Sequence, residues 1–186
     1  QKAAAEAVDR AGRAADSLTL GDAWTVYLRE RRSQWGDRHY ADHLAFAKAG
    51  GVKAKRGIKG GGLTVAGPLH SLLALRLIDL TPAVIEAWAA KEAATRPTYG
   101  RLAWRCLKVF LTWCGEQPAY QASMAHNPAK SRRSREAFGK PTVKTDVLLR
   151  EQLPAWFDAV RALGNPVASA YLQILLLTGA RPGEVL

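Results

Sequence analysis

The stretch from Asn165 to Leu186 constrains the fold most, because it predicts an apolar helix that ends in a tight turn. Asn165 followed by Pro166 is typical of a helix start, with an N-cap side chain and a proline at the first helical position. Apolar residues then recur at helical spacing on most sides of the segment: Val167, Ala170, Tyr171, Ile174, Leu175, Leu176 and Leu177. A helix that is apolar on most sides belongs in the interior of a domain.

Arg181 follows this helix after a predicted stop at Thr178 and Gly179, and Gly179 suits a left-handed C-cap. Pro182 then restarts a helix. The sequence thus predicts that a buried helix delivers one arginine to a turn between two helices. By local physics alone, Arg181 is as well suited to cap the last carbonyls of its helix as to bind a ligand, because the helix dipole favours a cation there.

The string from Leu177 to Leu186, Leu-Thr-Gly-Ala-Arg-Pro-Gly-Glu-Val-Leu, resembles the first catalytic-arginine motif of the tyrosine recombinases, the phage integrase family. That motif is a leucine-rich helix, then Thr-Gly-x-Arg, then Glu before an apolar pair. The resemblance implies that Arg181 grips the scissile phosphate, and that Glu184 is a supporting, inward-facing residue of the following helix. A guanidinium suits this task because it donates two hydrogen bonds to phosphate oxygens and stays charged.

The charge of the chain favours a polyanionic partner. Lys and Arg number 27 against 16 for Asp and Glu, which gives a formal net charge of +11. Such an excess most often indicates nucleic acid, although a generic basic surface would have the same composition. No run approaches the ~20 apolar residues of a membrane span, and the N-terminus lacks the hydrophobic core of a signal peptide.

Neither the cysteines nor the histidines indicate a metal or cofactor site. Cys106 and Cys114 lie on one predicted helix, about 12 Å apart along its axis, which is too far for a disulfide and indicates a reducing, cytoplasmic setting. His39 and His43 have a spacing that could bind a metal, but no third ligand accompanies them. We therefore expect solvent-facing or phosphate-facing histidines, no metal and no organic cofactor.

Residues 17–130 predict an all-α bundle, because helix start signals recur along this stretch and neither a confident strand nor a βαβ alternation is found. Thr19 with Asp22 is a weak capping box, and Thr81-Pro82 and Asn127-Pro128 are further start signals. This order of helices resembles the core-binding (SAM-like) domain of the integrase family. The fold class expected for the whole chain is therefore all-α, with a helical bundle, a basic linker and the first helices of a mixed α/β catalytic domain.

A helix from Thr98 to about Gly115 has two predicted faces. The core face consists of Leu102, Cys106, Val109, Phe110 and Trp113. The other face is a basic stripe at the same spacing, made of Arg101, Arg105 and Lys108 with Thr112. No Glu at i±4 neutralises this stripe. We expect it to lie against the phosphate backbone or in the major groove of double-stranded DNA, and a solvated surface without a ligand is the alternative.

The glycine- and lysine-rich residues 50–62 lack the Gly-Lys-Ser/Thr of a phosphate-binding P-loop, and no strand precedes them. A solvated loop and a mobile basic loop near phosphates fit equally well. The second interpretation would use Lys53, Lys55, Arg56 and Lys59.

Residues 131–146 form a basic segment interrupted by glycine and proline, which predicts an interdomain linker that tracks the DNA backbone. Its basic residues are Arg132, Arg133, Arg135, Lys140 and Lys144. Residues 147–186 are then the truncated N-terminal part of a catalytic domain. The Ala-rich residues 1–16 are expected to be a linker helix from a missing N-terminal domain.

The resemblance implies the DNA-binding portion of a prophage-type recombinase, which breaks and rejoins DNA through a 3′-phosphotyrosyl intermediate and assembles as a tetramer on DNA. Of the family's catalytic residues only Arg181 maps onto the chain, and no tyrosine here matches the nucleophile. The chain is therefore expected to bind double-stranded DNA without cutting it. Two alternatives stay open: a non-catalytic helical DNA-binding or scaffold protein, and a helical RNA-binding protein.

Overall fold

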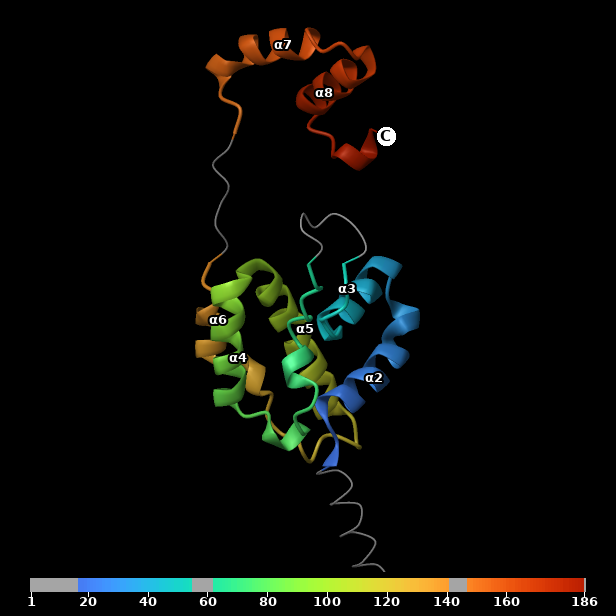
Figure 1. Cartoon of the computed structure of the whole chain (residues 1–186), viewed down its shortest axis with the longest axis vertical. Helices are drawn as coiled ribbons and strands as arrows, with labels where there is room; N and C mark the ends of the chain where they lie inside the picture. Colours follow the sequence, from blue (N-terminus) through green and yellow to red (C-terminus); the bar gives the residue numbers. More distant parts are fainter. Residues whose placement is uncertain (1–16, 55–61, 141–146, 186) are drawn as a thin grey trace, which may run out of the picture. The chain divides into compact units, whose positions relative to one another are not determined.

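The computed structural model describes residues 17–54, 62–140 and 147–185. By its internal contacts the chain divides into two compact units, residues 1–141 and 142–186. Every regular element in the described ranges is a helix, as Figure 1 shows, and the expected all-α fold is confirmed for them. The predicted linker helix at residues 1–16 lies outside the described residues.

The helices of the first unit follow one another with short 3-10 turns between them. They are α2 (Leu20–Arg31), η1 (Arg32–Gln34), α3 (Asp37–Ala47), η2 (His70–Leu72), η3 (Leu77–Asp79), α4 (Pro82–Thr95), α5 (Pro97–Glu116), η4 (Pro128–Lys130) and α6 (Arg132–Ala137). The second unit contains η5 (Arg150–Gln152), α7 (Leu153–Arg161), α8 (Pro166–Thr178) and η6 (Pro182–Glu184).

Side-chain caps start the helices at the predicted residues. The Thr19 hydroxyl accepts a hydrogen bond from the Asp22 N–H, and the Asp22 carboxylate accepts one from the Thr19 N–H, each at 3.1 Å. This pair closes a capping box before α2. Thr81 caps α4, and the Asn165 side chain accepts two backbone N–H groups at the start of α8. These caps satisfy N–H groups that have no partner within their helix.

Aromatic side chains from α2, α3 and α5 form the centre of the first unit. The rings of Trp24 and Tyr27 have their centroids 5.0 and 5.2 Å from that of Phe110. His43 stacks on Trp24 and is 2% exposed, and its Nδ1 lies 2.9 Å from the carbonyl oxygen of His39. Burial lowers the pKa of His43 and so favours its neutral ring. The expected solvent-facing or phosphate-facing position is therefore wrong for His43.

The glycine-rich segment, for which no strand was predicted, has two extended arms that pair antiparallel (Figure 1). We call residues 50–54 together with residues 62–66 the ribbon. The N–H of Gly51 donates to the carbonyl of Thr64 at 2.8 Å, and the N–H of Thr64 donates to the carbonyl of Val52 at 2.7 Å. Glycines on both arms interrupt the side-chain alternation by which a strand is recognised in a sequence.

The first half of the predicted basic linker is packed into the first unit. α6 contacts α4, Ser134 is fully buried and Phe138 is 4% exposed. The ring of Phe138 contacts those of Trp88 and Trp104. The structure therefore differs from the prediction of a linker from residue 131, because α6 has one buried side beneath its basic residues. Residues 141–146 lie outside the described residues.

The second unit leaves α8 exposed. Among residues 147–185 the buried positions are Val160 of α7 and Ser169 of α8. The apolar side chains of α8 lie open, with Val167 76% and Leu177 73% exposed. The expected burial of α8 is therefore not seen within this unit. A single neighbouring helix, α7, covers too little of a helix that is apolar on most sides.

Gly67→Ala is expected to destabilise the first unit by about 1–3 kcal/mol through overpacking. A Cβ at this position would lie 2.2 Å from the carbonyl oxygen of Phe46 and 2.3 Å from that of Ala45, and both are backbone atoms. Gly36→Ala is the matched control, because nothing lies within 4 Å of its Cβ position and its φ is −66°. Urea unfolding measures both variants, and equal midpoints would contradict the close packing at Gly67.

Candidate nucleic-acid interface

α5 carries the residues predicted to face DNA, and its packing shows which sides are buried. Phe110 and Trp113 are buried as predicted, but Leu102 and Val109 are 42% and 57% exposed, so their place in the core face was wrong. The buried side consists of Gly100, Ala103, Trp104, Leu107, Phe110, Leu111, Trp113 and Cys114. Small residues explain the shift: a Cβ at Gly100 would lie 2.9 Å from the Cβ of Glu92, so α4 approaches α5 closely at this side.

Arg101 of the predicted stripe takes part in packing. Its guanidinium donates hydrogen bonds to the carbonyl of Phe138 and, at 3.3 Å, to that of Gly139, just after α6. Its Nε is buried and without a partner among the described atoms. Arg101 therefore joins α5 to the end of α6, which leaves fewer of its N–H groups for a phosphate.

Arg105 and Lys108 reach the outer surface of α5. Arg105 is exposed and lines a shallow hollow of about 390 Å³ together with Leu102. The Lys108 ammonium lies 4.6 Å from the centroid of the Trp104 ring, a cation–π contact, and the side chain is half-buried. Both cations are thus placed by the helix that forms the core of the unit.

The structure adds two cations that sequence reasoning missed, Arg31 of α2 and Lys130 of η4. Both line one shallow hollow of about 280 Å³ with Lys108 and a single acid, Glu116. We call Arg31, Arg105, Lys108 and Lys130 the cationic edge of α5. Helical spacing along α5 could not reveal Arg31 and Lys130, because they come from other elements and meet α5 only in the folded unit.

The basic residues of α6 are exposed but partly paired. Arg132 forms an ion pair with Glu136 at 2.6 Å, and Nη1 of Arg133 lies 4.0 Å from Glu86. Exposed pairs of this kind contribute little to stability, so they yield readily to a phosphate. Arg135 and Lys140 are also exposed.

The remaining predicted contacts belong to the ribbon and to the segment after α6. Lys53 is exposed on one arm of the ribbon. Lys55, Arg56, Lys59 and Lys144 lie outside the described residues.

Arg181 lies in the turn that was predicted at the end of α8. Gly179 adopts the left-handed conformation with a φ of 65°, and its N–H donates to the carbonyl of Leu175 at 3.0 Å. The Arg181 N–H donates to Oε2 of Glu184 at 2.9 Å, and Nη1 lies 3.4 Å from Oε1. The Arg181 side chain is 87% exposed. It therefore pairs with Glu184 and does not cap helical carbonyls, and the helix expected after Pro182 is one 3-10 turn, η6.

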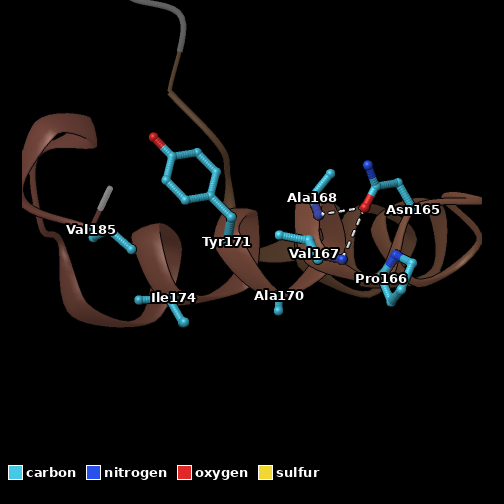
Figure 2. A pocket seen from close by; sticks show the side chains of 8 residues that line it. All are labelled: Asn165, Pro166, Val167, Ala168, Ala170, Tyr171, Ile174 and Val185. Atoms are coloured by element: carbon cyan, nitrogen blue, oxygen red, sulfur yellow. Dashed lines mark hydrogen bonds between the residues drawn. The ribbon is translucent and has the colours of Figure 1, made fainter.

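An apolar groove of about 670 Å³ lies beside this turn in the second unit (Figure 2). The Tyr171 hydroxyl donates to the carbonyl of Pro182 at 3.2 Å, which holds η6 against α8. The lining residues are Asn165, Pro166, Val167, Ala168, Ala170, Tyr171, Ile174 and Val185. Because Tyr171 is the one titratable side chain of this set, the groove suits an apolar surface better than acid–base chemistry.

Burial disfavours the anionic forms of both cysteines and of Tyr27 in the first unit. Burial raises the pKa of Cys106 to about 11 and that of Cys114 to about 12, and both thiols are free. Burial also raises the pKa of Tyr27 to about 12. Their anionic forms are therefore scarce at neutral pH.

The described part of the chain has neither a metal-binding cluster nor a membrane-spanning helix. No group of three or more His, Cys, Asp or Glu side chains there is placed to hold a metal ion. None of its helices is both long and apolar enough to cross a membrane.

The first unit is a helical bundle with a cationic edge, and the second unit presents Arg181 at the turn that ends α8. Residues 19–136 match the family model of the phage integrase core-binding domain, and the chain therefore belongs to this family.

One protein similar to the chain is the prophage integrase IntF of Escherichia coli strain K12. It is 42% identical to the chain over 177 residues, which is 90% of this chain and 37% of that protein. The chain thus spans little more than a third of the length of this relative. The match confirms the prophage-type integrase resemblance stated from the sequence. No solved structure matches the chain.

Arg101→Ala is expected to lower the free energy of unfolding by about 1–2 kcal/mol, because two carbonyls after α6 lose a charged donor. Arg105→Ala removes the same charge from an exposed position one turn further along α5, and should stay within about 0.5 kcal/mol of the parent. Urea unfolding of both variants checks this contrast. An unchanged midpoint for Arg101→Ala would show that Arg101 has no structural role.

Proposed function

We propose that the chain is the DNA-binding portion of a site-specific tyrosine recombinase of prophage type, with double-stranded DNA as its partner. The observation that carries the proposal is the cationic edge of α5 on a fold of the core-binding family. Lysine and arginine that neutralise phosphates supply a large share of the affinity of a protein for duplex DNA. The relative's name, a prophage integrase, agrees with this function.

α5 offers both kinds of contact that a duplex requires. Arg105 lies beside the exposed apolar side chains of Leu102 and Val109. An α-helix fits the major groove, where arginine binds guanine and apolar groups contact the methyl group of thymine. Phosphate contacts position a protein on the duplex but do not distinguish one base sequence from another. We assign these contacts to the other cations. These are Arg31, Lys108 and Lys130 of the edge, Arg101 in part, Lys53, Lys55, Arg56 and Lys59, and Arg132, Arg133, Arg135, Lys140 and Lys144.

In the complete recombinase, Arg181 binds the scissile phosphate. A tyrosine hydroxyl gives its proton to a general base and attacks phosphorus, a 3′-phosphotyrosyl bond forms, and the bond to the 5′ oxygen breaks as that oxygen takes a proton from a general acid. A 5′ hydroxyl of another strand reverses the step and rejoins the DNA. Negative charge grows on the non-bridging oxygens, and the two-pronged guanidinium of Arg181 stabilises it there. The exposed pair with Glu184 orients the guanidinium and is weak enough to be exchanged for a phosphate.

We also propose the organisation expected for such a recombinase, with a core-binding domain from residue 17 and the beginning of a catalytic domain from residue 147. The complete protein assembles as a tetramer on DNA. The free thiols of Cys106 and Cys114 suit a reducing compartment, the cytoplasm.

A second candidate function is a helical DNA-binding or scaffold protein without catalysis. The pairing of Arg181 with Glu184 favours it, because an arginine whose charge is already matched needs no phosphate.

The chain is expected to bind duplex DNA with an affinity that falls steeply with salt, with a log–log slope of about −0.9 for each neutralised phosphate. Lys130→Gln should weaken binding and make the slope less steep by about one phosphate, because Lys130 is an exposed cation of the edge assigned to phosphate contact. Arg38→Gln on α3 is a control, since Arg38 is 91% exposed and outside the cationic edge. Fluorescence anisotropy over a salt series measures all three proteins. An affinity of the parent that does not change with salt would refute DNA binding of this kind.

Arg181→Ala is expected to lower DNA cleavage by the complete recombinase about 10²–10³-fold, because transition-state charge loses its donor. Arg181→Lys should restore little of this activity, since an ammonium lacks the two-pronged geometry. Arg161→Ala removes an exposed arginine of α7 and should leave cleavage unchanged. A suicide substrate that traps the covalent intermediate gives the readout. Full cleavage by Arg181→Ala would refute the proposed role of Arg181, and a parent protein that cleaves no DNA would support the second candidate.

A further inference from the structure

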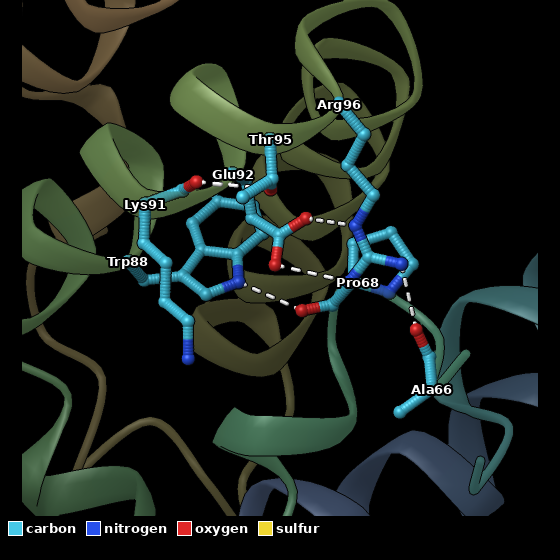
Figure 3. Close-up of polar contacts among 7 residues, drawn as sticks. All are labelled: Ala66, Pro68, Trp88, Lys91, Glu92, Thr95 and Arg96. Atoms are coloured by element: carbon cyan, nitrogen blue, oxygen red, sulfur yellow. Dashed lines mark hydrogen bonds and ion pairs between the residues drawn. The ribbon is translucent and has the colours of Figure 1, made fainter. Parts of the chain in front are cut away.

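A partly buried ion pair at the end of α4 holds the foot of the ribbon. Glu92 is 4% exposed, and its carboxylate accepts two hydrogen bonds from Arg96, from Nε at 2.5 Å and from Nη2 at 3.1 Å. The third arm of the same guanidinium, Nη1, donates to the carbonyl of Ala66 at 2.6 Å. Figure 3 shows Arg96 between the carboxylate and this carbonyl. One side chain therefore links α4 to the second arm of the ribbon.

Further bonds fix the chain just below the ribbon. The indole N–H of Trp88 donates to the carbonyl of Pro68 at 2.8 Å (Figure 3). The N–H of Gly67 donates to the carbonyl of Lys48 at 2.8 Å. The ribbon thus leaves the core from a rigid base. Arg96 also lies between α4 and α5, so the same residue fixes the ribbon to the start of the helix with the cationic edge.

Above this base, one side of the ribbon is open and carries a cation beside apolar groups. Lys53 faces Leu63 across the antiparallel pair. Val65 shares their side, because side chains alternate along an extended strand. Leu63 is 64% and Val65 79% exposed, and Lys53 is exposed as well. We call Lys53, Leu63 and Val65 the ribbon face.

The stretch of sequence that contains the ribbon carries charge of one sign. Residues 43–78 contain six Lys and Arg and no Asp or Glu. A two-stranded ribbon is narrow enough to enter the major groove of DNA, and a cation between apolar side chains can meet a phosphate while its neighbours contact sugars or thymine methyl groups. The single sign of charge favours DNA over a second copy of this basic chain.

We propose that the ribbon face is a second DNA-contacting element, separate from α5, and that Arg96 is the residue that positions it. The proposal rests on the DNA-binding function proposed above. Arginine suits the task, because its planar fork satisfies the buried carboxylate and still has a donor for Ala66. Burying the Glu92 carboxylate is costly, and apolar residues often replace such an ion pair without loss of stability, so its use points to a task in orientation.

The variant Glu92→Leu/Arg96→Met tests the positioning. It removes both charges together, so no unpaired charge stays buried, and the midpoint of urea unfolding should stay close to that of the parent. The bond to Ala66 is lost. Hydrogen exchange of the ribbon amides of Gly51 and Thr64 should accelerate, while amides of α5 should not. Unchanged exchange at Gly51 and Thr64 would show that Arg96 does not hold the ribbon, and would overturn the proposal.

A double-mutant cycle then separates positioning from general stability. The ribbon-face variant Lys53→Gln/Leu63→Ser/Val65→Ser and the Glu92→Leu/Arg96→Met variant are each titrated with a fluorescent DNA duplex of mixed sequence, alone and combined. Each should weaken binding about fivefold, and the combination should be little weaker than the ribbon-face variant alone, a coupling usual for residues of one network. The proposal is overturned if Glu92→Leu/Arg96→Met weakens binding equally in the parent and in the ribbon-face variant, or if either variant binds DNA as tightly as the parent.

Two comparisons complete the design. Lys91→Gln removes one exposed positive charge from α4. Any loss of DNA affinity that it causes should be equal in the parent and in the ribbon-face variant. Arg96→Lys keeps the positive charge but lacks the planar guanidinium. Its DNA affinity should therefore lie between that of the parent and that of the Glu92→Leu/Arg96→Met variant. If the parent chain itself shows no salt-dependent binding, DNA binding fails together with this inference. If the parent binds and the ribbon-face variant binds as well as the parent, this inference alone fails.

Discussion

The burial of one side of α5 is the interaction on which the first unit depends. Its aromatic residues meet those of α2 around Tyr27, whose ring lies 5.2 Å from Phe110 and 5.1 Å from Trp113. Burial of large aromatic side chains is among the strongest stabilising terms in a small domain. Once this side is buried, the outward direction of Arg105 and of the apolar residues beside it follows from helical geometry alone.

Polar side chains of the helices then hold the connections that have no regular structure. The indole N–H of Trp104 donates to the carbonyl of Ala129, and the Asn127 amide donates to the carbonyl of Lys108. Arg96 and Arg101 do the same for Ala66 and Phe138. The carbonyls of Ala66, Ala129 and Phe138 lie outside the α-helices, and a buried carbonyl without a partner would be costly; the bond to Lys108 instead ties Asn127 to the middle of α5. The bundle therefore uses part of its positive charge for its own packing, so net charge alone overstates the cations available to DNA.

The second unit has clear local sequence signals but buries few of its apolar side chains. α8 has good local signals at both ends, yet Val167 and Leu177 lie exposed, and its apolar groove is lined almost wholly by groups that do not titrate. Arg181 has a defined turn and a paired carboxylate but no further catalytic group beside it among the described residues of its unit. The geometry of this unit places one exposed arginine at a defined turn, where the proposed function requires a phosphate-binding group.

The sequence by itself determined the starts and ends of helices and the turn that carries Arg181. The capping box of Thr19 with Asp22 and the left-handed Gly179 depend on bonds within a few residues, which a sequence displays directly. Only the tertiary structure decided which sides of α5 are buried, that α6 is packed, and that Arg96 reaches Ala66, 30 residues away. α5 has apolar residues on several sides, so its neighbours, brought together by folding, selected the buried one.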